Sequence, residues 1–196
     1  MARRARTATI SRRTKETQIA VTLDLDGSGK CRISTGIPFF DHMIETICRH
    51  ATFDVDLKCK GDVAVDLHHT VEDVGLCFGQ AIKQALGDKA GIARFGSAAV
   101  PMDEALVLAS VDLSGRAYFA LDLDLKRRKV RDFEVEHVAE FFRALANAGM
   151  FNLHIRQLAG ANTHHLVEAA FKACAVALAQ AVQRHRGGIP TTKGTL

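Results

Sequence analysis

The chain has 196 residues, of which 47% are hydrophobic and 24% charged, so it is long enough for a substantial core and typical of a soluble globular protein. It has no run approaching the roughly 18 apolar residues of a membrane span, and its basic N-terminus lacks the apolar segment of a secretory signal, so we expect no membrane association. Part of the formal charge of +4 lies in two basic runs without interleaved aromatic residues, so we expect no nucleic-acid partner.

The first half of the chain predicts strands and helices from the period of its apolar residues. Alternation predicts strands, and apolar residues three or four apart predict helices. A turn at 26–29 suggests a hairpin between the first two strands. In chain order we expect strands at 18–25 and 30–35, a helix from Pro38, a strand at 53–57 and a helix at 65–86 ended by Gly87.

The second half repeats this order. We expect strands at 106–113 and 116–123, a helix at 134–148, a strand at 151–155 and a helix at 164–186. There is room for one more strand at the start of each half, at 7–13 and 94–100. No Pro- or Ser-rich linker separates the halves, so we predict a duplicated unit that shares one core.

The halves also align at polar positions. An offset of 98 residues, set by the strands at 53–57 and 151–155, places His42 on Glu140. With two residues fewer in the next loop, two His-His-x-x-Glu sequences coincide: His68-His69-Thr70-Val71-Glu72 and His164-His165-Leu166-Val167-Glu168. Nearer the N-terminus, an offset of 88 places Glu16 on Glu104. Agreement at this many polar positions favours a duplicated ligand set.

These sequences predict metal binding. On a helix, residues four apart share a face, whereas adjacent side chains point about 100° apart. His68 and Glu72 can therefore bind one ion while His69 points toward another, and the second sequence repeats this. Imidazole with carboxylate favours Mn, Fe or Zn over Mg or Ca. Adding His42 and Glu140 gives four protein ligands to each of two ions, which leaves positions open for substrate and predicts a catalytic centre.

Several neighbouring residues have two interpretations. His137 lies three residues before Glu140 and is the alternative ligand there, but Glu140 is preferred because it aligns with His42. Asp73 is either an acid that orients a histidine or an exposed acid on the helix. Glu16, just before a strand, is a candidate general acid/base.

The five cysteines show no C-x-x-C spacing, and four of them have apolar neighbours. Buried, reduced thiols of this kind are typical of cytoplasmic proteins. We therefore expect a cytoplasmic location.

Three segments closely resemble the imidazoleglycerol-phosphate dehydratase family: Gly36-Ile37-Pro38-Phe39-Phe40-Asp41-His42-Met43, Asp66-Leu67-His68-His69-Thr70-Val71-Glu72-Asp73 and Asn162-Thr163-His164-His165-Leu166-Val167-Glu168-Ala169. So do Pro101-Met102-Asp103-Glu104-Ala105-Leu106, Asp112-Leu113-Ser114-Gly115-Arg116 and Ile189-Pro190-Thr191-Thr192-Lys193-Gly194. The resemblance covers essentially the whole chain.

The resemblance implies the sixth step of histidine biosynthesis, in which imidazole glycerol phosphate loses water to give imidazole acetol phosphate. It implies two Mn²⁺ ions per active site and a homo-oligomer of 24 chains with sites between subunits. It also implies an α+β fold of two similar halves, each a four-stranded sheet with two helices, the helices forming a bundle between the sheets. We expect a single domain, residues 1–196, made of repeats at about 7–90 and 92–186 and a tail at 187–196.

The resemblance also assigns residues. The family's metal ligands map onto His42, His68, His69, Glu72, Glu140, His164, His165 and Glu168. The position of Glu140 is a histidine in some members, and Leu67 stands where relatives often have Asp. The substrate-binding positions map onto Glu16, His50, Arg94, Arg116, Lys172, Thr191, Thr192 and Lys193. Among these, Arg94, Arg116 and Lys193 are expected to hold the phosphate.

The chemistry of this dehydration fits a di-metal centre. The proton to be removed lies on a carbon attached to imidazole, with no carbonyl to stabilise a carbanion. An imidazolate held between two cations can push electrons toward the departing hydroxyl through a diazafulvene-like intermediate, with Glu16 moving the proton. Two alternatives stay open: a two-metal hydrolase of a phosphate ester or amide, and a non-enzymatic metal-storage oligomer. Such hydrolases usually use a bridging Asp, and none is duplicated at the helical ligand positions.

Overall fold

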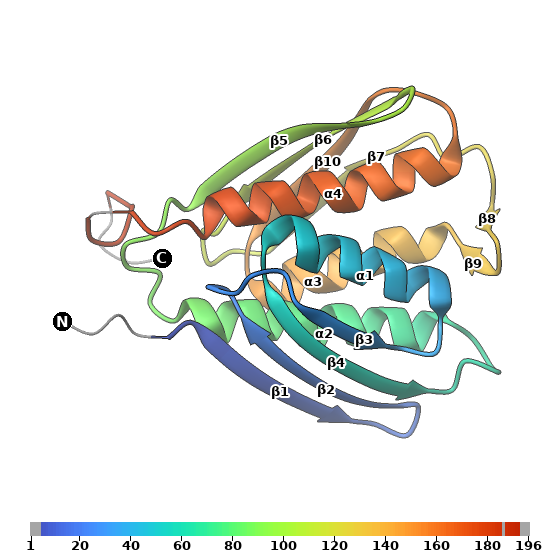
Figure 1. Ribbon diagram of the computed structural model, residues 1–196, viewed down its shortest axis with the longest axis horizontal. Coiled ribbons are helices and arrows are strands. Elements are labelled where there is room, and N and C mark those ends of the chain that lie inside the picture. Colours follow the sequence, from blue (N-terminus) through green and yellow to red (C-terminus); the bar gives the residue numbers. More distant parts are fainter. Residues whose placement is uncertain (1–4, 186, 193–196) are drawn as a thin grey trace.

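The structure, a computed structural model that describes residues 5–185 and 187–192, places long helices between two four-stranded sheets (Figure 1). The first half contains β1 (Thr7–Arg13), β2 (Thr17–Asp24), β3 (Cys31–Ser34), α1 (Pro38–Ala51), β4 (Asp54–Gly61) and α2 (His68–Leu86). The second half contains β5 (Phe95–Met102), β6 (Ala105–Asp112), β7 (Tyr118–Asp122), the short β8 (Lys129–Val130) and β9 (Phe133–Glu134), α3 (Glu136–Gly149), β10 (Asn152–Ala159) and α4 (Thr163–Ala181).

The two halves have the same topology, which confirms the predicted α+β fold of duplicated halves. Their sheets have the strand orders β1-β2-β4-β3 and β5-β6-β10-β7. The bounds of α3 and β10 follow those of α1 and β4 at the predicted offset of 98 residues. Even the helix ends agree, because Thr52 and Met150 close α1 and α3 in the left-handed conformation, with φ of 58° and 53°. The strands β1 and β5 fill the places left open at the start of each half.

The predicted hairpins at 18–35 and 106–123 are wrong in their pairing. The strand β4 lies between β2 and β3, and β3 runs parallel to β4. In the second half β10 separates β6 from β7 in the same way. Alternation identifies a strand but carries no information about its partner. The short hairpin of β8 and β9 was not expected, since each strand has only two residues.

The helices pack across the two halves. In the bundle α1 packs against α4, and α2 packs against α3. The approach of α2 to α3 depends on Gly75 and Gly79, because a Cβ at these positions would lie 2.8 Å from the Phe141 carbonyl oxygen and 2.4 Å from the Leu145 carbonyl oxygen. A larger residue at either position would therefore push the two helices apart.

The buried apolar side chains form one continuous core that includes residues of both sheets and all four long helices. Phe141 stacks on Phe171 with ring centroids 5.4 Å apart, and Phe40 contacts Phe141 edge to face. All five cysteines lie within the described residues and are free thiols, three of them buried. Burial raises the pKa of the Cys174 thiol to about 12, so it stays protonated. No helix among the described residues is both long and apolar enough to cross a membrane.

Candidate metal and substrate site

Both His-His-x-x-Glu sequences lie at the start of a helix, and all four long helices begin at the same end of the molecule (Figure 1). A short polar side chain sets each start. Asp66 accepts a hydrogen bond from the backbone N–H of His68 at 2.9 Å, and Asn162 accepts one from that of His164 at 2.9 Å. These side chains satisfy backbone donors that the first helical turn leaves free. The histidines therefore leave the helix ends in similar directions in both halves.

The second-half motif forms a cluster with α1. Oε2 of Glu168 lies 3.2 Å from Nε2 of His164 and 3.6 Å from Nε2 of His42. The other carboxylate oxygen forms an ion pair with Nζ of Lys172 at 2.8 Å. The side chain of Glu168 is only 11% exposed. Its carboxylate contacts two candidate metal ligands and one candidate substrate-binding residue.

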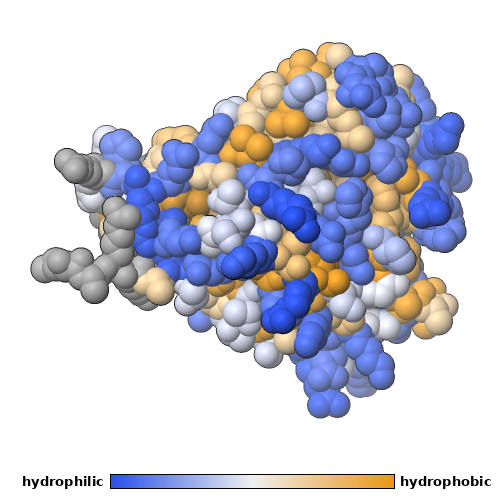
Figure 2. Space-filling model, in the orientation of Figure 1, coloured by the Kyte–Doolittle hydropathy of each residue, from blue (hydrophilic) through white to orange (hydrophobic). Residues whose placement is uncertain are grey.

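Within one chain, this arrangement brings His42 to the motif of the other half. We expected each motif to be joined by a residue from the preceding helix, which would place His42 with His68 and Glu72. Instead His42 joins Glu168, because α1 packs against α4 of the other half. The face that carries α1 and α4 is mostly hydrophilic, with apolar residues between the polar ones (Figure 2).

The first-half motif is more open. Nε2 of His68 lies 3.6 Å from Oε2 of Glu72, which is 47% exposed. Nδ1 of His69 lies 3.1 Å from Oδ2 of Asp62, while its Nε2 lies 3.9 Å from Oε1 of Glu16. The predicted general acid/base Glu16 is thus next to a predicted metal ligand.

The second histidine of each motif is held by a carboxylate. Glu104 lies 2.7 Å from Nδ1 of His165, as Asp62 lies beside Nδ1 of His69. A carboxylate at Nδ1 fixes the tautomer and leaves Nε2 free to bind a metal. Sequence reasoning missed Asp62, although its place seven residues before His69 and directly after a strand was a usable signal.

The charges within the clusters favour ionised carboxylates. Hydrogen bonding to His165 lowers the pKa of Glu104 to about 2 and raises the pKa of His165. Burial alone would raise the pKa of Glu168, but the hydrogen bond from Lys172 and nearby positive charge outweigh it, so the pKa is lowered. Asp62 raises the pKa of His69. Glu104 and Glu168 are therefore anions at neutral pH.

The ligand from α3 remains a prediction. Glu140 lies on α3, which packs against α2, and its Oε1 accepts a hydrogen bond from Nη1 of Arg143 at 2.5 Å. The alternative ligand His137 is buried, and its ring centroid lies 6.2 Å from that of His68. Within residues 5–185 and 187–192, Nδ1 of His137 has no hydrogen-bond partner. Both residues are thus on the helix that borders the first-half motif.

Asp73 holds two strands to α2. It accepts hydrogen bonds from Nε of Arg12 at 2.9 Å and from the Thr17 hydroxyl at 2.5 Å. Because Asp73 is buried and both of its oxygens are engaged by β1 and β2, both predicted interpretations are wrong: it is not exposed, and it does not orient a histidine.

The expected phosphate-binding residues lie elsewhere. Arg94 donates to both carboxylate oxygens of Asp112, at 2.7 and 3.1 Å, and to the Pro190 carbonyl oxygen at 2.8 Å. Arg116 is exposed near the same corner, since Leu113 pairs with the backbone of Arg94.

The remaining substrate-binding positions divide between the second-half cluster around Glu168 and the corner around Arg94, Asp112 and Arg116, which we call the Arg94 corner. Thr191 and Thr192 follow Pro190 and so belong to the Arg94 corner, while Lys193 lies outside the described residues. His50 is on α1, where burial and the charge of Lys172 lower its pKa. His50 and Lys172 therefore adjoin the second-half cluster.

The Arg94 corner and the histidine clusters are at opposite ends of α4. The backbone N–H of Arg94 donates to the Ala181 carbonyl oxygen at the end of this helix. From Glu168 to Ala181 the helix spans roughly 20 Å, at about 1.5 Å per residue. In one chain, the two regions are therefore too far apart to contact the same small molecule.

The donor types of the clusters, imidazole and carboxylate, suit first-row metal ions. Adjacent ligands of an ion with bonds of about 2.1 Å at right angles lie roughly 3.0 Å apart. The separations of 3.2 and 3.6 Å around Glu168 and of 3.6 Å between His68 and Glu72 are close to this value. Among the described residues of a single chain, no group of three or more His, Cys, Asp or Glu side chains meets the full geometry of a metal site.

Residues 35–178 match the family model described as imidazoleglycerol-phosphate dehydratase. A protein of that name from Pelotomaculum thermopropionicum is 57% identical over 97% of this chain and 98% of its own length, and one from Gluconacetobacter diazotrophicus is 53% identical over 98% of each. Among solved structures, IGPD from Pyrococcus furiosus in complex with (S)-C348 superposes with a TM-score of 0.84, at 37% identity over 95% of this chain and all of its own. The Staphylococcus aureus enzyme gives 0.83 at 34% identity, over 91% of this chain and 99% of its own. The chain therefore belongs to the imidazoleglycerol-phosphate dehydratase family.

Proposed function

We propose that this protein dehydrates imidazole glycerol phosphate to imidazole acetol phosphate in histidine biosynthesis, and that the reaction depends on Mn²⁺. The reaction is that of a carbon–oxygen lyase. The observation that carries the proposal is the pair of His-His-x-x-Glu helix starts with imidazole and carboxylate atoms at ligand spacing. This donor set suits manganese better than Mg²⁺ or Ca²⁺.

Two ions per active site would be held by eight side chains: His42, His68, His69, Glu72, Glu140, His164, His165 and Glu168. When bound, the ions would supply Lewis acidity that stabilises negative charge on the imidazole ring of the substrate. The carboxylates of Asp62 and Glu104 orient His69 and His165, so that each presents Nε2.

Glu16 moves the proton in this proposal. It is half exposed on the turn between β1 and β2, and its carboxylate lies beside His69. It can therefore reach a substrate whose ring is held at the same histidine.

The phosphate is bound by the cations of the Arg94 corner. Arg94 and Arg116, together with Thr191, Thr192 and Lys193, supply the donors that a phosphate dianion needs. Because this corner is roughly 20 Å from Glu168 along α4, the phosphate site and the metal ligands that serve one substrate come from different chains. We therefore propose an oligomer with active sites between subunits, and the family resemblance favours 24 chains.

The decisive experiment is a turnover assay on imidazole glycerol phosphate after chelation and after adding back Mn²⁺. We expect acetol phosphate formation to be lost on chelation and restored by manganese. Release of inorganic phosphate instead would favour a two-metal hydrolase. Many weakly held ions per chain without turnover would favour metal storage. Either result would overturn the proposal.

A further inference from the structure

The loop between α2 and β5 carries two cationic residues on unusual backbone. Lys89 and Arg94 have φ of 60° and 71°, in the left-handed region that side chains other than glycine rarely adopt. Such conformations persist where the surroundings enforce them, and they concentrate at binding sites. Contacts with the C-terminal segment hold this loop in place. The backbone N–H of Gly91 donates to the Gly188 carbonyl oxygen, and the Gly91 carbonyl oxygen accepts from the His185 N–H.

The residue Lys89 is largely buried. Its residue surface is only 7% exposed. Within the described part of the chain its ammonium group makes no hydrogen bond or ion pair. Burial, together with the charge of Lys83, lowers its pKa from the ordinary value of a lysine. Because the ammonium nitrogen has no partner there and yet is not among the fully buried unpaired atoms, it reaches solvent and is available to an anionic ligand.

The nearest carboxylate is already engaged. Asp112 lies within electrostatic range of Lys89, but Arg94 donates to both of its oxygens. Among the described residues, one carboxylate therefore faces both Lys89 and Arg94, so these three side chains carry more positive than negative charge. Arg116, which is exposed, adds a further cation at the same end of the molecule.

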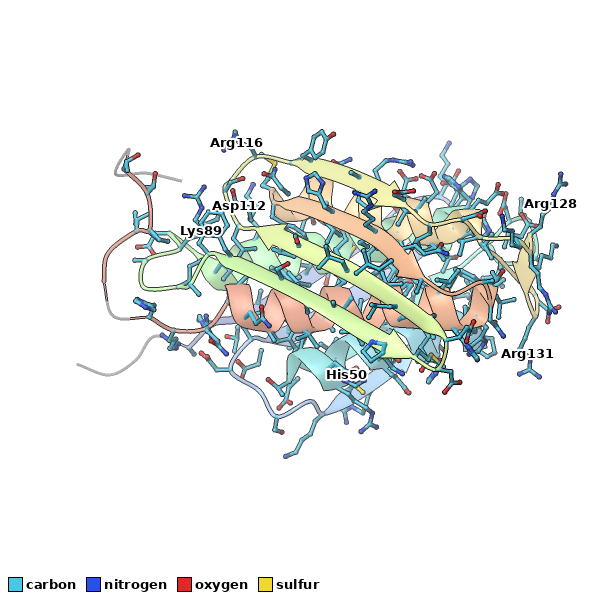
Figure 3. The ribbon with its side chains drawn as sticks, turned by 90° about the horizontal axis from the view of Figure 1, so that it is seen from above. His50, Lys89, Asp112, Arg116, Arg128 and Arg131 are labelled. Carbon is cyan, nitrogen blue, oxygen red and sulfur yellow. The ribbon has the colours of Figure 1, made fainter. Side chains whose placement is uncertain are left out.

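Figure 3 places Lys89, Asp112 and Arg116 together at one end, opposite Arg128 and Arg131. The Pro190 carbonyl oxygen, which accepts from Arg94, brings the C-terminal segment to this corner as well. Lys89 thus belongs to the corner where Arg94 and Arg116 are proposed to hold a phosphate.

We propose that Lys89 is a further phosphate-binding residue, whose ammonium group donates to the phosphate that Arg94 and Arg116 hold. The inference rests on the function proposed above, because the phosphate is that of the substrate. It extends that function by assigning the phosphate recognition of the site to the loop between α2 and β5, as well as to the C-terminal segment.

The test compares Lys89→Met with Lys83→Met, an exposed lysine on α2 near the same corner, and with Lys89→Arg. The first measurement is the thermal unfolding of the full-length protein with and without inorganic phosphate. Lys89→Met is expected to unfold at the wild-type temperature or above it without phosphate, and to lose the stabilisation by phosphate. Lys83→Met and Lys89→Arg are expected to keep that stabilisation.

The second measurement is the turnover of imidazole glycerol phosphate by the manganese-loaded protein. Lys89→Met is expected to raise KM by about tenfold or more, as loss of one charge-assisted hydrogen bond would, with kcat changed far less. An unchanged KM together with an unchanged phosphate effect would overturn the assignment of Lys89. So would a large loss of stability without phosphate that Lys89→Arg restores, because that pattern marks a structural lysine. Absence of turnover in the wild type would contradict the proposed function alone, since the phosphate measurement does not depend on it.

Discussion

The two His-His-x-x-Glu motifs have the same sequence pattern but different surroundings. In the second half Glu104 holds Nδ1 of His165, and the carboxylate of Glu168 is nearly buried against His42 and Lys172. In the first half Asp62 holds His69, so that Glu16, the counterpart of Glu104, is left beside Nε2 of this histidine. At the predicted offset the counterpart of Asp62 is Gly160, which has no carboxylate. Each second histidine thus has two acids beside it, since Asp103 lies 3.6 Å from Nε2 of His165, but Asp62 takes the Nδ1 position in the first half and leaves Glu16 available for the proposed proton transfer.

The largest expected effect distinguishes Glu16 from Glu104. Glu16→Gln should lower turnover by about 100- to 10,000-fold while manganese stays bound, because it removes a general acid/base. Glu104→Gln should instead weaken manganese binding, and excess manganese should restore much of the activity. Metal content by atomic absorption and turnover at two manganese concentrations would separate these outcomes. Near-normal turnover of a metal-loaded Glu16→Gln enzyme would refute the role of Glu16.

A second substitution tests whether Asp62 performs the task of Glu104. Asp62→Asn should weaken manganese binding by about 10- to 100-fold, the usual consequence of removing an acid that orients a histidine ligand. The matched control is Asp56→Asn. Asp56 is in β4, the strand that Asp62 follows, and it is paired with Arg32 at the surface. Equal manganese affinities in the two variants, measured by competition with a chelator, would remove Asp62 from the site.

The two motif glutamates should differ in stability before any metal is added. Glu168→Gln breaks a nearly buried ion pair with Lys172 and should lower the unfolding free energy of the metal-free protein by about 1–3 kcal/mol. Glu72→Gln, at an exposed position, should change it by less than about 0.5 kcal/mol. Urea denaturation of both variants checks the comparison, and equal losses would show that the two environments are equivalent.

The smallest expected effect concerns the end of the molecule opposite the histidine clusters. Hydrogen bonds from Arg6 and Arg184 lower the pKa of Asp26, so its contribution is present at neutral pH and is lost as the pH falls below about 4. Because Asp26 is over a third exposed, solvent screening limits this contribution to below about 1 kcal/mol. Asp26→Asn should therefore reduce the acid dependence of stability.

The counterpart of Asp26 at the offset of 88 is Ser114, which cannot titrate. Ser114→Ala is accordingly the control, and its melting temperature should follow the same pH profile as the wild type. A profile unaltered by Asp26→Asn would show that another group causes the acid sensitivity.

The repeat in the sequence predicted much of this architecture because its period was visible at polar as well as apolar positions. It predicted the offset of 98 residues that relates α3 to α1, and helical spacing alone predicted His68 beside Glu72. The repeat did not predict which strands or side chains contact one another when they are far apart in the sequence. The pairing of β3 with β4 and the contact of His42 with Glu168 depend on which surfaces meet, and local periodicity does not encode this. Lys89 was overlooked for a similar reason, since its burial arises from the fold.

The crossed packing of α1 on α4 and of α2 on α3 has an evolutionary consequence. A half-length chain with this topology would lack its helix partners and could bury its helices only against a second copy. The present chain has the form of such a symmetric pair joined by the loop at 87–94. Once joined, the copies no longer had to remain identical. A carboxylate could arise at Asp62 in one copy while the other kept Gly160, which two separate but identical chains could never have achieved.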